Sequence, residues 1–287
     1  MNESGRSISG TKSGAGASKT VGSDLPGALQ VNNLALEDLH TALIKGYRDF
    51  EAVPSHGVFL VVIYPLIGLV IFRLFVLGLP VLPILYPLAA GFALLGPFAA
   101  IGLYELSRRC EQGLDVSPLN VLDVLRAPGA ATIGILGLML LGIFLLWLWA
   151  AHAIFLFAFG EVQPATLREL LRMSFTTGAG WKLVLIGNGV GFLFAVLTFC
   201  VSVVSFPIAL DRNLSAVDAI WMSLRVVAAN PLVMAAWGMV VASALALGTL
   251  LFLVGLIVVL PVLAHASWHL YRIAIETKKK RRTRSKA

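Results

Sequence analysis

The chain has 287 residues, of which 58% are hydrophobic and only 13% are charged, and its mean hydropathy is +0.88. Charged residues make up about a quarter of a typical soluble domain, so a soluble protein of this length is excluded. The net charge of +7 does not indicate a nucleic-acid partner, because seven of the 22 basic residues lie between Lys278 and Lys286 and the others flank apolar windows. Basic residues in these positions indicate membrane topology and contacts with anionic lipid headgroups.

Both ends of the chain differ in composition from its apolar middle. Residues 1–35 are rich in Ser and Gly and lack the apolar core of a signal peptide, so a disordered cytoplasmic tail is expected there. Residues 276–287 are expected to form a basic cytoplasmic tail that binds anionic lipids. The stretch 36–275 between them is predicted to be one membrane domain. The two cysteines, Cys110 and Cys200, imply no disulfide framework.

Five windows of the sequence contain no Asp, Glu, Lys or Arg, and each is long enough to cross a bilayer. A helix crosses the roughly 30 Å hydrocarbon layer in about 20 residues, so the windows predict an all-α polytopic membrane protein. Pro87 and Pro97 are expected to bend the second span, because proline removes a backbone donor and clashes with the preceding turn. The first four predicted spans are Gly57–Leu77, Ile84–Glu105, Ala130–Phe157 and Leu183–Ala209.

The last charge-free window, 226–271, decides whether the number of spans is odd or even. A single helix over Pro231–Ile273 would be about 64 Å long, twice what a bilayer needs. Two helices with a turn between Gly248 and Gly255 fit better. The prediction is therefore six transmembrane helices arranged as three hairpins.

Six spans place both termini on the same side of the membrane, and the distribution of basic residues indicates which side. With both termini in the cytoplasm, 18 basic residues lie inside and four lie outside, namely Arg73, Arg168, Arg172 and Lys182. Because cytoplasmic loops carry the excess of Lys and Arg, we expect both termini to be cytoplasmic. The expected location is a bacterial inner membrane.

Three short amphipathic segments precede the first, fourth and fifth spans. Two of them begin with capping patterns, Thr166-x-x-Glu169 before the fourth span and Ser215-x-x-Asp218 before the fifth. We expect interfacial helices that seal the bundle, and docking of a partner helix is the alternative. The apolar faces before the first and fifth spans comprise Leu36, Leu39, Leu43, Tyr47 and Phe50, and Leu214, Val217, Trp221, Leu224 and Ala228.

A repeat occurs at the cytoplasmic ends of the even-numbered spans. Residues 97–108 and 261–272 share a proline, an alanine three residues later, an aromatic residue seven later and an arginine eleven later. A weaker third copy begins at Pro207 and places Asp211 at the offset of His265. The repeat favours three hairpins built on one plan.

Two stretches resemble a known family. Residues 91–109, GFALLGPFAAIGLYELSRR, and residues 260–272, LPVLAHASWHLYR, are similar to a bacterial integral membrane family called domain of unknown function 2189. The likeness covers roughly residues 36–275. It implies a six-span layout and a membrane location, and because the family has no assigned activity it implies no mechanism.

Ionisable side chains near the cytoplasmic ends of spans two, four and six form the candidate site. At such depths they cost several kcal/mol unless they pair or meet water, so we expect an inward-facing polar ring. Glu105, His265 and His269 are expected to share hydrogen bonds across the bundle. The predicted ring consists of Glu105, Arg108, Asp211, His265, His269 and Arg272.

His265 and His269 stand one helical turn apart, a spacing that could present two imidazoles to a metal ion or haem. Ala266 stands where a metalloprotease would need its general base. A hydrogen-bonded vestibule is the expected role of both histidines, and a metal or haem site or a proton or solute path are the alternatives. A third metal ligand would have to be Glu105, Asp211 or His152.

The chain contains no motif of a catalytic or cofactor-binding site. We therefore expect a non-enzymatic accessory or interaction component that needs no cofactor. Its expected partners are the bilayer and either another membrane protein or further copies of itself. The alternatives are a small-solute or lipid permease with a polar site near the cytoplasmic face, and a metal- or haem-dependent membrane enzyme that uses His265 and His269.

Overall fold

The computed structural model describes residues 29–53, 86–88, 90–91, 93–160, 162, 164, 166–250 and 255–277. Within this part, five helical segments are long and apolar enough to cross a membrane, and they coincide with the second to sixth predicted spans. This finding confirms the predicted all-α membrane architecture, while the predicted first span, Gly57–Leu77, lies outside the described residues. The five segments are Tyr86–Gln112, Ala130–Phe159, Gly178–Asp211, Pro231–Leu250 and Leu256–Ala274.

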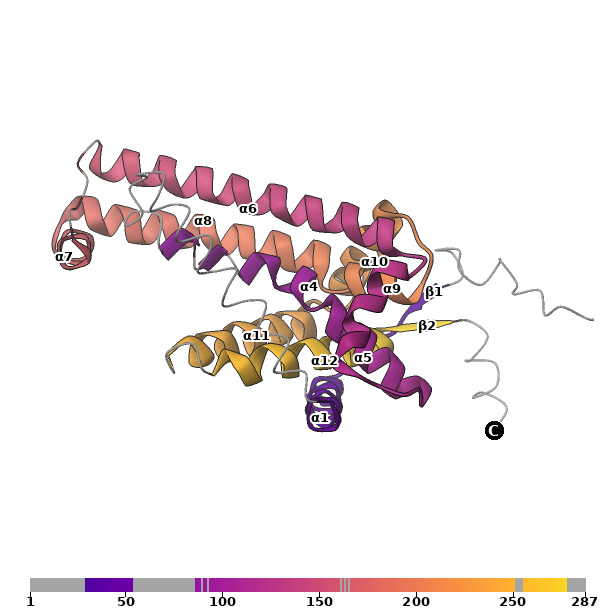
Figure 1. Cartoon of the computed structure of the whole chain (residues 1–287). Coiled ribbons are helices and arrows are strands. Elements are labelled where there is room, and N and C mark those ends of the chain that lie inside the picture. Colours follow the sequence, from indigo (N-terminus) through magenta and orange to yellow (C-terminus); the bar gives the residue numbers. More distant parts are fainter. Residues whose placement is uncertain are drawn as a thin grey trace, which may run out of the picture.

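The long helices form two pairs, and the pair α6 and α8 runs along most of an elongated molecule (Figure 1). α6 (Ala130–Phe159) and α8 (Gly178–Ser202) lie side by side, and α7 (Leu167–Thr176) follows α6 at their far end. α11 (Pro231–Leu250) packs against α12 (Leu256–Ala274). The side chain of Thr166 accepts a hydrogen bond from the backbone N–H of Glu169, so the predicted cap of α7 is present.

The end of the molecule opposite α7 is called the polar end below. It holds most of the buried core, whereas α6 exposes large apolar side chains such as Leu138 and Trp149 along its length. A soluble protein rarely exposes so much contiguous apolar surface, and a bilayer would cover it. The elements gathered at the polar end are α1 (Leu36–Ala52), α5 (Ile101–Gln112), α9 (Ser205–Asp211) and α10 (Ala216–Ala229).

The second predicted span is interrupted at Pro97. The segment contains the 3₁₀ turn η3 (Ala93–Leu95) and the short helix α4 (Gly96–Ala99) before α5 begins at Ile101. Pro97 lies in the first turn of α4, where a missing backbone N–H removes no helical hydrogen bond. The interruption therefore follows from Pro97, as the sequence predicts.

The hydroxyl of Ser223, on another helix, bonds to both backbone groups at the break between α8 and α9. Pro207 cannot continue a regular helix, and the chain leaves helical geometry between Ser202 and Ser205. The Val204 N–H, which would ordinarily bond to the Cys200 carbonyl, donates instead to Ser223 Oγ at 3.2 Å. Ser223 Oγ in turn donates to that carbonyl at 2.8 Å. The inserted hydroxyl thus satisfies both backbone groups at the break.

α10 shows two faces. Ser215 caps its first turn by accepting from the Asp218 N–H, as the sequence predicts. Its buried face consists of Ala219, Met222, Ser223 and Val226, and not of the predicted apolar stripe. Two stripe residues, Val217 and Trp221, are 75% and 59% exposed. This arrangement fits an interfacial helix whose apolar stripe meets lipid.

α1 packs tightly across α12. A Cβ atom added at Gly46 would lie 2.5 Å from the backbone nitrogen of Ala266 and 2.8 Å from its Cβ, so only glycine permits this approach. Leu39 and Ala42 are buried in the same contact. The predicted surface helix is therefore part of the bundle, although Tyr47 on its predicted apolar face is half exposed.

A small antiparallel sheet at the polar end was not predicted. β1 (Leu29–Val31) pairs with β2 (Ile275–Thr277), and the Asn230 amide donates to the backbone carbonyl of Asn32. Residues 29–35, predicted as part of a disordered tail, are thus held against the membrane domain, and the strand extends two residues into the predicted basic tail. Sequence analysis missed the sheet because a three-residue strand has no detectable periodicity.

Candidate functional site

All six residues of the predicted ring lie on α5, α9 and α12, whose ends meet at the polar end (Figure 1). They do not form a single ring. The structure divides them among three clusters, each centred on a carboxylate: Asp49, Glu105 and Asp211.

The Asp49 cluster joins α1, α5 and α12. Asp49 Oδ2 accepts from Ser107 Oγ at 2.6 Å, and His269 Nε2 lies 2.8 Å from the same oxygen. Ser107 Oγ also lies 2.7 Å from His265 Nδ1. Ser107 and His265 are fully buried, whereas Asp49 and His269 keep 15% and 11% of their side-chain surface exposed. The cluster therefore runs from the core to the edge of the bundle.

The helix geometry explains how these side chains meet. His265 and His269 are four residues apart on α12 and so project from one face. Gly46 lets α1 approach that helix closely, and Asp49 follows one turn later on the same face of α1. The close crossing thus places the carboxylate of Asp49 against the histidines.

With Asp49 as the final acceptor, the hydrogen bonds of the Asp49 cluster are donated from His265 to Ser107 and from Ser107 to Asp49. An ionised Asp49 can only accept, so the single hydroxyl proton of Ser107 goes to it and His265 Nδ1–H must donate to Ser107 Oγ. His269 donates its Nε2–H to the same carboxylate. A catalytic serine needs the opposite order, in which its hydroxyl donates to histidine and histidine donates to aspartate. These bonds link α1, α5 and α12, and their order is opposite to that of a catalytic serine.

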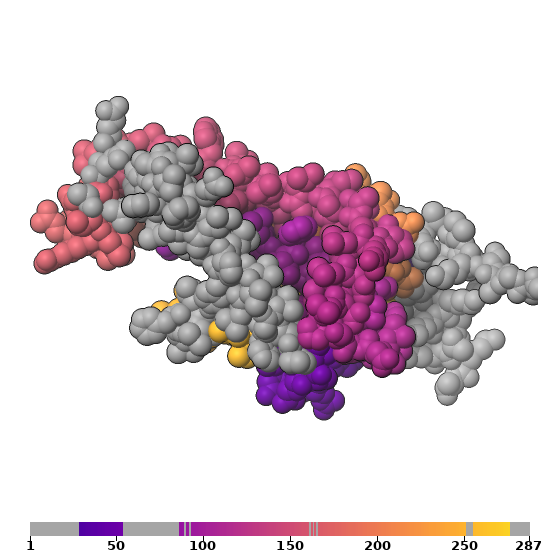
Figure 2. All heavy atoms as spheres, viewed as in Figure 1, coloured from indigo at the N-terminus to yellow at the C-terminus, as the bar shows by residue number. Residues whose placement is uncertain are grey.

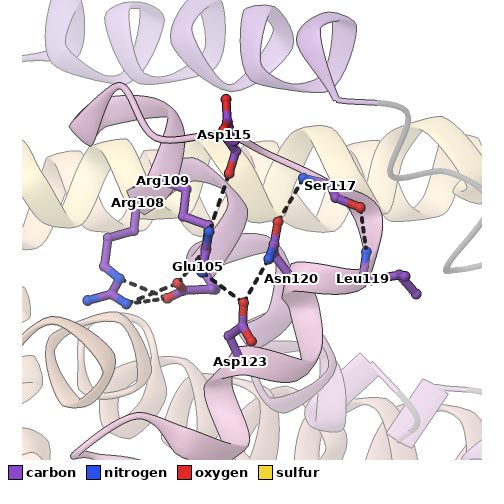
Figure 3. Close-up of polar contacts among 8 residues, drawn as sticks. All are labelled: Glu105, Arg108, Arg109, Asp115, Ser117, Leu119, Asn120 and Asp123. Carbon is purple, nitrogen blue, oxygen red and sulfur yellow. Dashed lines mark hydrogen bonds and ion pairs between the residues drawn. The ribbon is translucent and has the colours of Figure 1, made fainter.

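The Glu105 cluster ties α5 to the following segment, η4 (Pro118–Arg126) (Figure 3). Arg108 Nε donates to Glu105 Oε2 at 2.8 Å, and Arg109 Nε donates to Oε1 at 3.1 Å. Arg109 Nη2 also donates to Asp123 Oδ2 at 2.8 Å, and Asn120 donates to that oxygen. Glu105 is only 2% exposed and is neutralised by arginines of its own helix. Among the described residues it shares no hydrogen bond with either histidine.

The Asp211 cluster joins α5, α9 and α12. Asp211 Oδ2 accepts from the Tyr271 hydroxyl at 2.6 Å and from Arg272 Nη1 at 3.1 Å. Arg272 Nε donates to Glu111 Oε1 at 3.1 Å, so this guanidinium bridges two carboxylates on different helices. The positions that correspond in the sequence repeat, Asp211 and His265, thus have different partners.

The sequence allowed a metal centre built on the two histidines. His265 and His269 bond to different groups, Ser107 and Asp49. Across the part of the chain that the structure describes, no group of three or more His, Cys, Asp or Glu side chains is placed to hold a metal ion. The third ligands considered from sequence do not complete a site there.

Sequence analysis missed several residues of these clusters. Asp49 lies on the polar face of an amphipathic segment, where a solvated carboxylate is the usual expectation. Ser107 lies in the quoted stretch 91–109 but in no catalytic or ligand-binding pattern, and Asp123 lies in neither. The only available signal was Gly46, since a glycine inside an amphipathic helix indicates a close backbone approach.

The long helices expose apolar side chains, and the ionisable side chains at the polar end bond to one another. These two features define a helical integral membrane protein. Residues 85–211 match the family described as "Predicted integral membrane protein (DUF2189)". The match confirms the resemblance found in residues 91–109, which it includes, whereas the second motif at 260–272 lies outside the matched range. No curated protein and no solved structure matches the chain.

Proposed function

We propose that the protein is a non-enzymatic, six-span component of a bacterial inner membrane that acts through contacts with lipid and with other membrane protein chains. The observation that carries this proposal is the mutual pairing of the polar groups at the polar end. The Asp49 and Asp211 clusters connect α1, α5, α9 and α12. Polar groups that satisfy one another stabilise a scaffold, so its outer surfaces are the part left to interact.

The β1–β2 pair supports an even number of spans. Residues 29–31 and 275–277 are adjacent, so the described chain enters and leaves the bundle at the same end. Five crossings alone would put these segments on opposite sides of the membrane. A sixth crossing at Gly57–Leu77, where the sequence predicts a span outside the described residues, gives the even number and the layout of three hairpins.

The distribution of charge supports a cytoplasmic polar end. Arg168, Arg172 and Lys182 lie at the end marked by α7, on α7 and in the first turns of α8. Most other basic residues lie in segments at the polar end or in the two tails. The positive-inside rule then assigns the polar end and both termini to the cytoplasm, where the tail 278–287 can bind anionic lipids.

The geometry favours this proposal over a permease. Transporters commonly place broken helices and binding groups near the bilayer midplane. Here the break between α8 and α9 is filled by Ser223, and the ionisable clusters lie at one end of the bundle. Solute uptake by proteoliposomes remains the direct test of that alternative.

Photo-crosslinking in intact membranes tests the interaction role. A benzophenone amino acid is placed at Leu138 of α6 or Met239 of α11, which are 70% and 67% exposed. The proposal expects a discrete crosslink to a second copy or to another membrane protein from at least one position. A buried position, Leu136, serves as the control. Adducts with lipid alone at both exposed positions would contradict the interaction role.

Metal analysis of the purified full chain tests the non-enzymatic, cofactor-free part of the proposal. The expected result is a colourless protein with substoichiometric metal. The contrary result is stoichiometric iron, zinc or haem in the unmodified protein. If that content is lower in His269→Ala and unchanged in the surface variant Arg48→Ala, the enzyme alternative replaces the proposal.

A further inference from the structure

The connection between α5 and α6 carries a ridge of exposed leucines. η4 is a 3₁₀ helix of nine residues, and a 3₁₀ helix has three residues per turn, so side chains three positions apart lie on one line. Leu119, Leu122 and Leu125 follow this spacing and are 75%, 60% and 76% exposed. These three side chains are called the leucine ridge below.

The other two sides of η4 are fixed to the protein. Val124 is buried, and Val121 packs so closely on Gly102 that a Cβ atom there would lie 2.8 Å from the valine Cβ. On the remaining side, Asp123 accepts from both Arg109 and Asn120 (Figure 3). Leu119 points away from this polar group in the same view. The ridge is therefore held outward by apolar packing on one side and by hydrogen bonds on the other.

The position of η4 in the chain identifies the bilayer as the surface that covers the ridge. Gln112 ends one membrane-length helix and Ala130 begins the next, so η4 lies within a few residues of two membrane crossings. Figure 2 shows the magenta segment that includes α5 and η4 on the molecular surface, at the end opposite α7. The ridge thus lies close in the chain to helices whose exposed apolar faces a bilayer would cover.

The other described connectors between spans show the same property. Leu167 and Leu171 of α7 are 50% and 49% exposed, and Val217 and Trp221 of α10 are exposed as well. Arg126 ends η4 and is exposed beside the ridge, where an anionic headgroup complements its charge. Apolar ridges with flanking basic residues are typical of helices that lie in the membrane interface.

We infer that η4 is an in-plane membrane wedge whose leucine ridge inserts into the leaflet at the polar end, with Arg126 at the level of the lipid phosphates. From Leu119 to Leu125 the ridge spans roughly 12 Å at about 2 Å per residue. A ridge lying in the plane enters only the upper acyl region, about 5–10 Å deep. The hydrogen bond from Arg109 to Asp123 ties η4 to α5.

Lipid-dependent quenching of a fluorophore tests this inference on the full chain. Single cysteines replace Leu119, Leu122 or Leu125 in a Cys110→Ser, Cys200→Ser background, are labelled with the polarity-sensitive dye NBD and are reconstituted in nanodiscs. Lipids carry a quenching doxyl group either near the headgroup or deep in the chain. The controls are Asp115→Cys, in the same exposed connection, and Leu138→Cys, on the exposed face of α6.

The wedge predicts blue-shifted emission at all three ridge positions, with stronger quenching by the shallow doxyl lipid than by the deep one. Leu138→Cys should show the reverse order, and Asp115→Cys should show little quenching by either. Emission and quenching at the three leucines equal to those of Asp115→Cys would overturn the inference and leave a soluble protein partner as the occupant. If an NBD-labelled variant is not monodisperse in detergent, a spin label is attached at the same position instead. The wedge then requires that oxygen reach this label more readily than a spin label at Asp115→Cys.

Discussion

Replacing Asp49 by alanine should destabilise the protein more than any other single change in the Asp49 cluster. The variant removes the acceptor of two hydrogen bonds and leaves Ser107 and His269 without it. Each buried donor left unsatisfied costs about 1–3 kcal/mol. Ser107 is fully buried, whereas His269 is 11% exposed and can reach water, so we expect a loss of about 2–4 kcal/mol in the free energy of unfolding.

A double-mutant cycle isolates the pair. His269→Ala alone removes one bond and should cost about 1–2 kcal/mol, and the double variant should cost less than the sum by about 0.5–3 kcal/mol because the two residues are in contact. The assay is unfolding in mixed detergent micelles with increasing dodecyl sulfate, followed by tryptophan fluorescence. Arg48→Ala, an exposed neighbour on α1, is the matched control and should change stability by less than about 0.5 kcal/mol.

Two results would refute this reasoning. If Asp49→Ala unfolds like Arg48→Ala, the carboxylate does not hold α1 on α12. If Asp49→Ala and His269→Ala are additive, the 2.8 Å contact between their side chains has no energetic consequence.

Three further predictions follow from other contacts. Gly46→Ala should lower the free energy of unfolding by about 1–3 kcal/mol, because its Cβ would meet the Ala266 backbone. The control Gly187→Ala, whose Cβ would have nothing within 4 Å, should be neutral or stabilising in the same assay. Equal effects of the two substitutions would argue against the close crossing of α1 and α12. Glu105→Gln and His269→Ala should be additive within about 0.5 kcal/mol, since they share no bonding partner, and a coupling above about 1 kcal/mol would restore the single polar ring. A periplasm-active phosphatase fused after Ala287 should be inactive while one inserted after Val162 should be active, and the opposite pattern would reverse the proposed orientation.

The candidate site was predictable in location and less so in its contacts. His265, Asp211 and Arg272 carry polar groups at the ends of apolar windows, so their cost in the membrane marks them without any structure. Their partners are a different matter. Asp49 is separated from His269 by 220 positions, and its face of α1 looks solvated in sequence, so nothing local indicates that the carboxylate is largely buried against α12.

The sequence by itself determined the class of the protein and the positions of its described spans, because a bilayer demands about 20 apolar residues per crossing and that demand is met locally. It also indicated the bend at Pro97 and the caps at Thr166 and Ser215, since each depends on backbone chemistry within a few residues. The break before Pro207 lies inside the predicted fourth span, Leu183–Ala209, and was not predicted. Tertiary structure decided which polar groups meet, that Ser223 fills the α8–α9 break, and that β1 pairs with β2. Those contacts depend on how closely helices approach in space, and a feature such as the Gly46 crossing sets that distance in a way that hydropathy does not record.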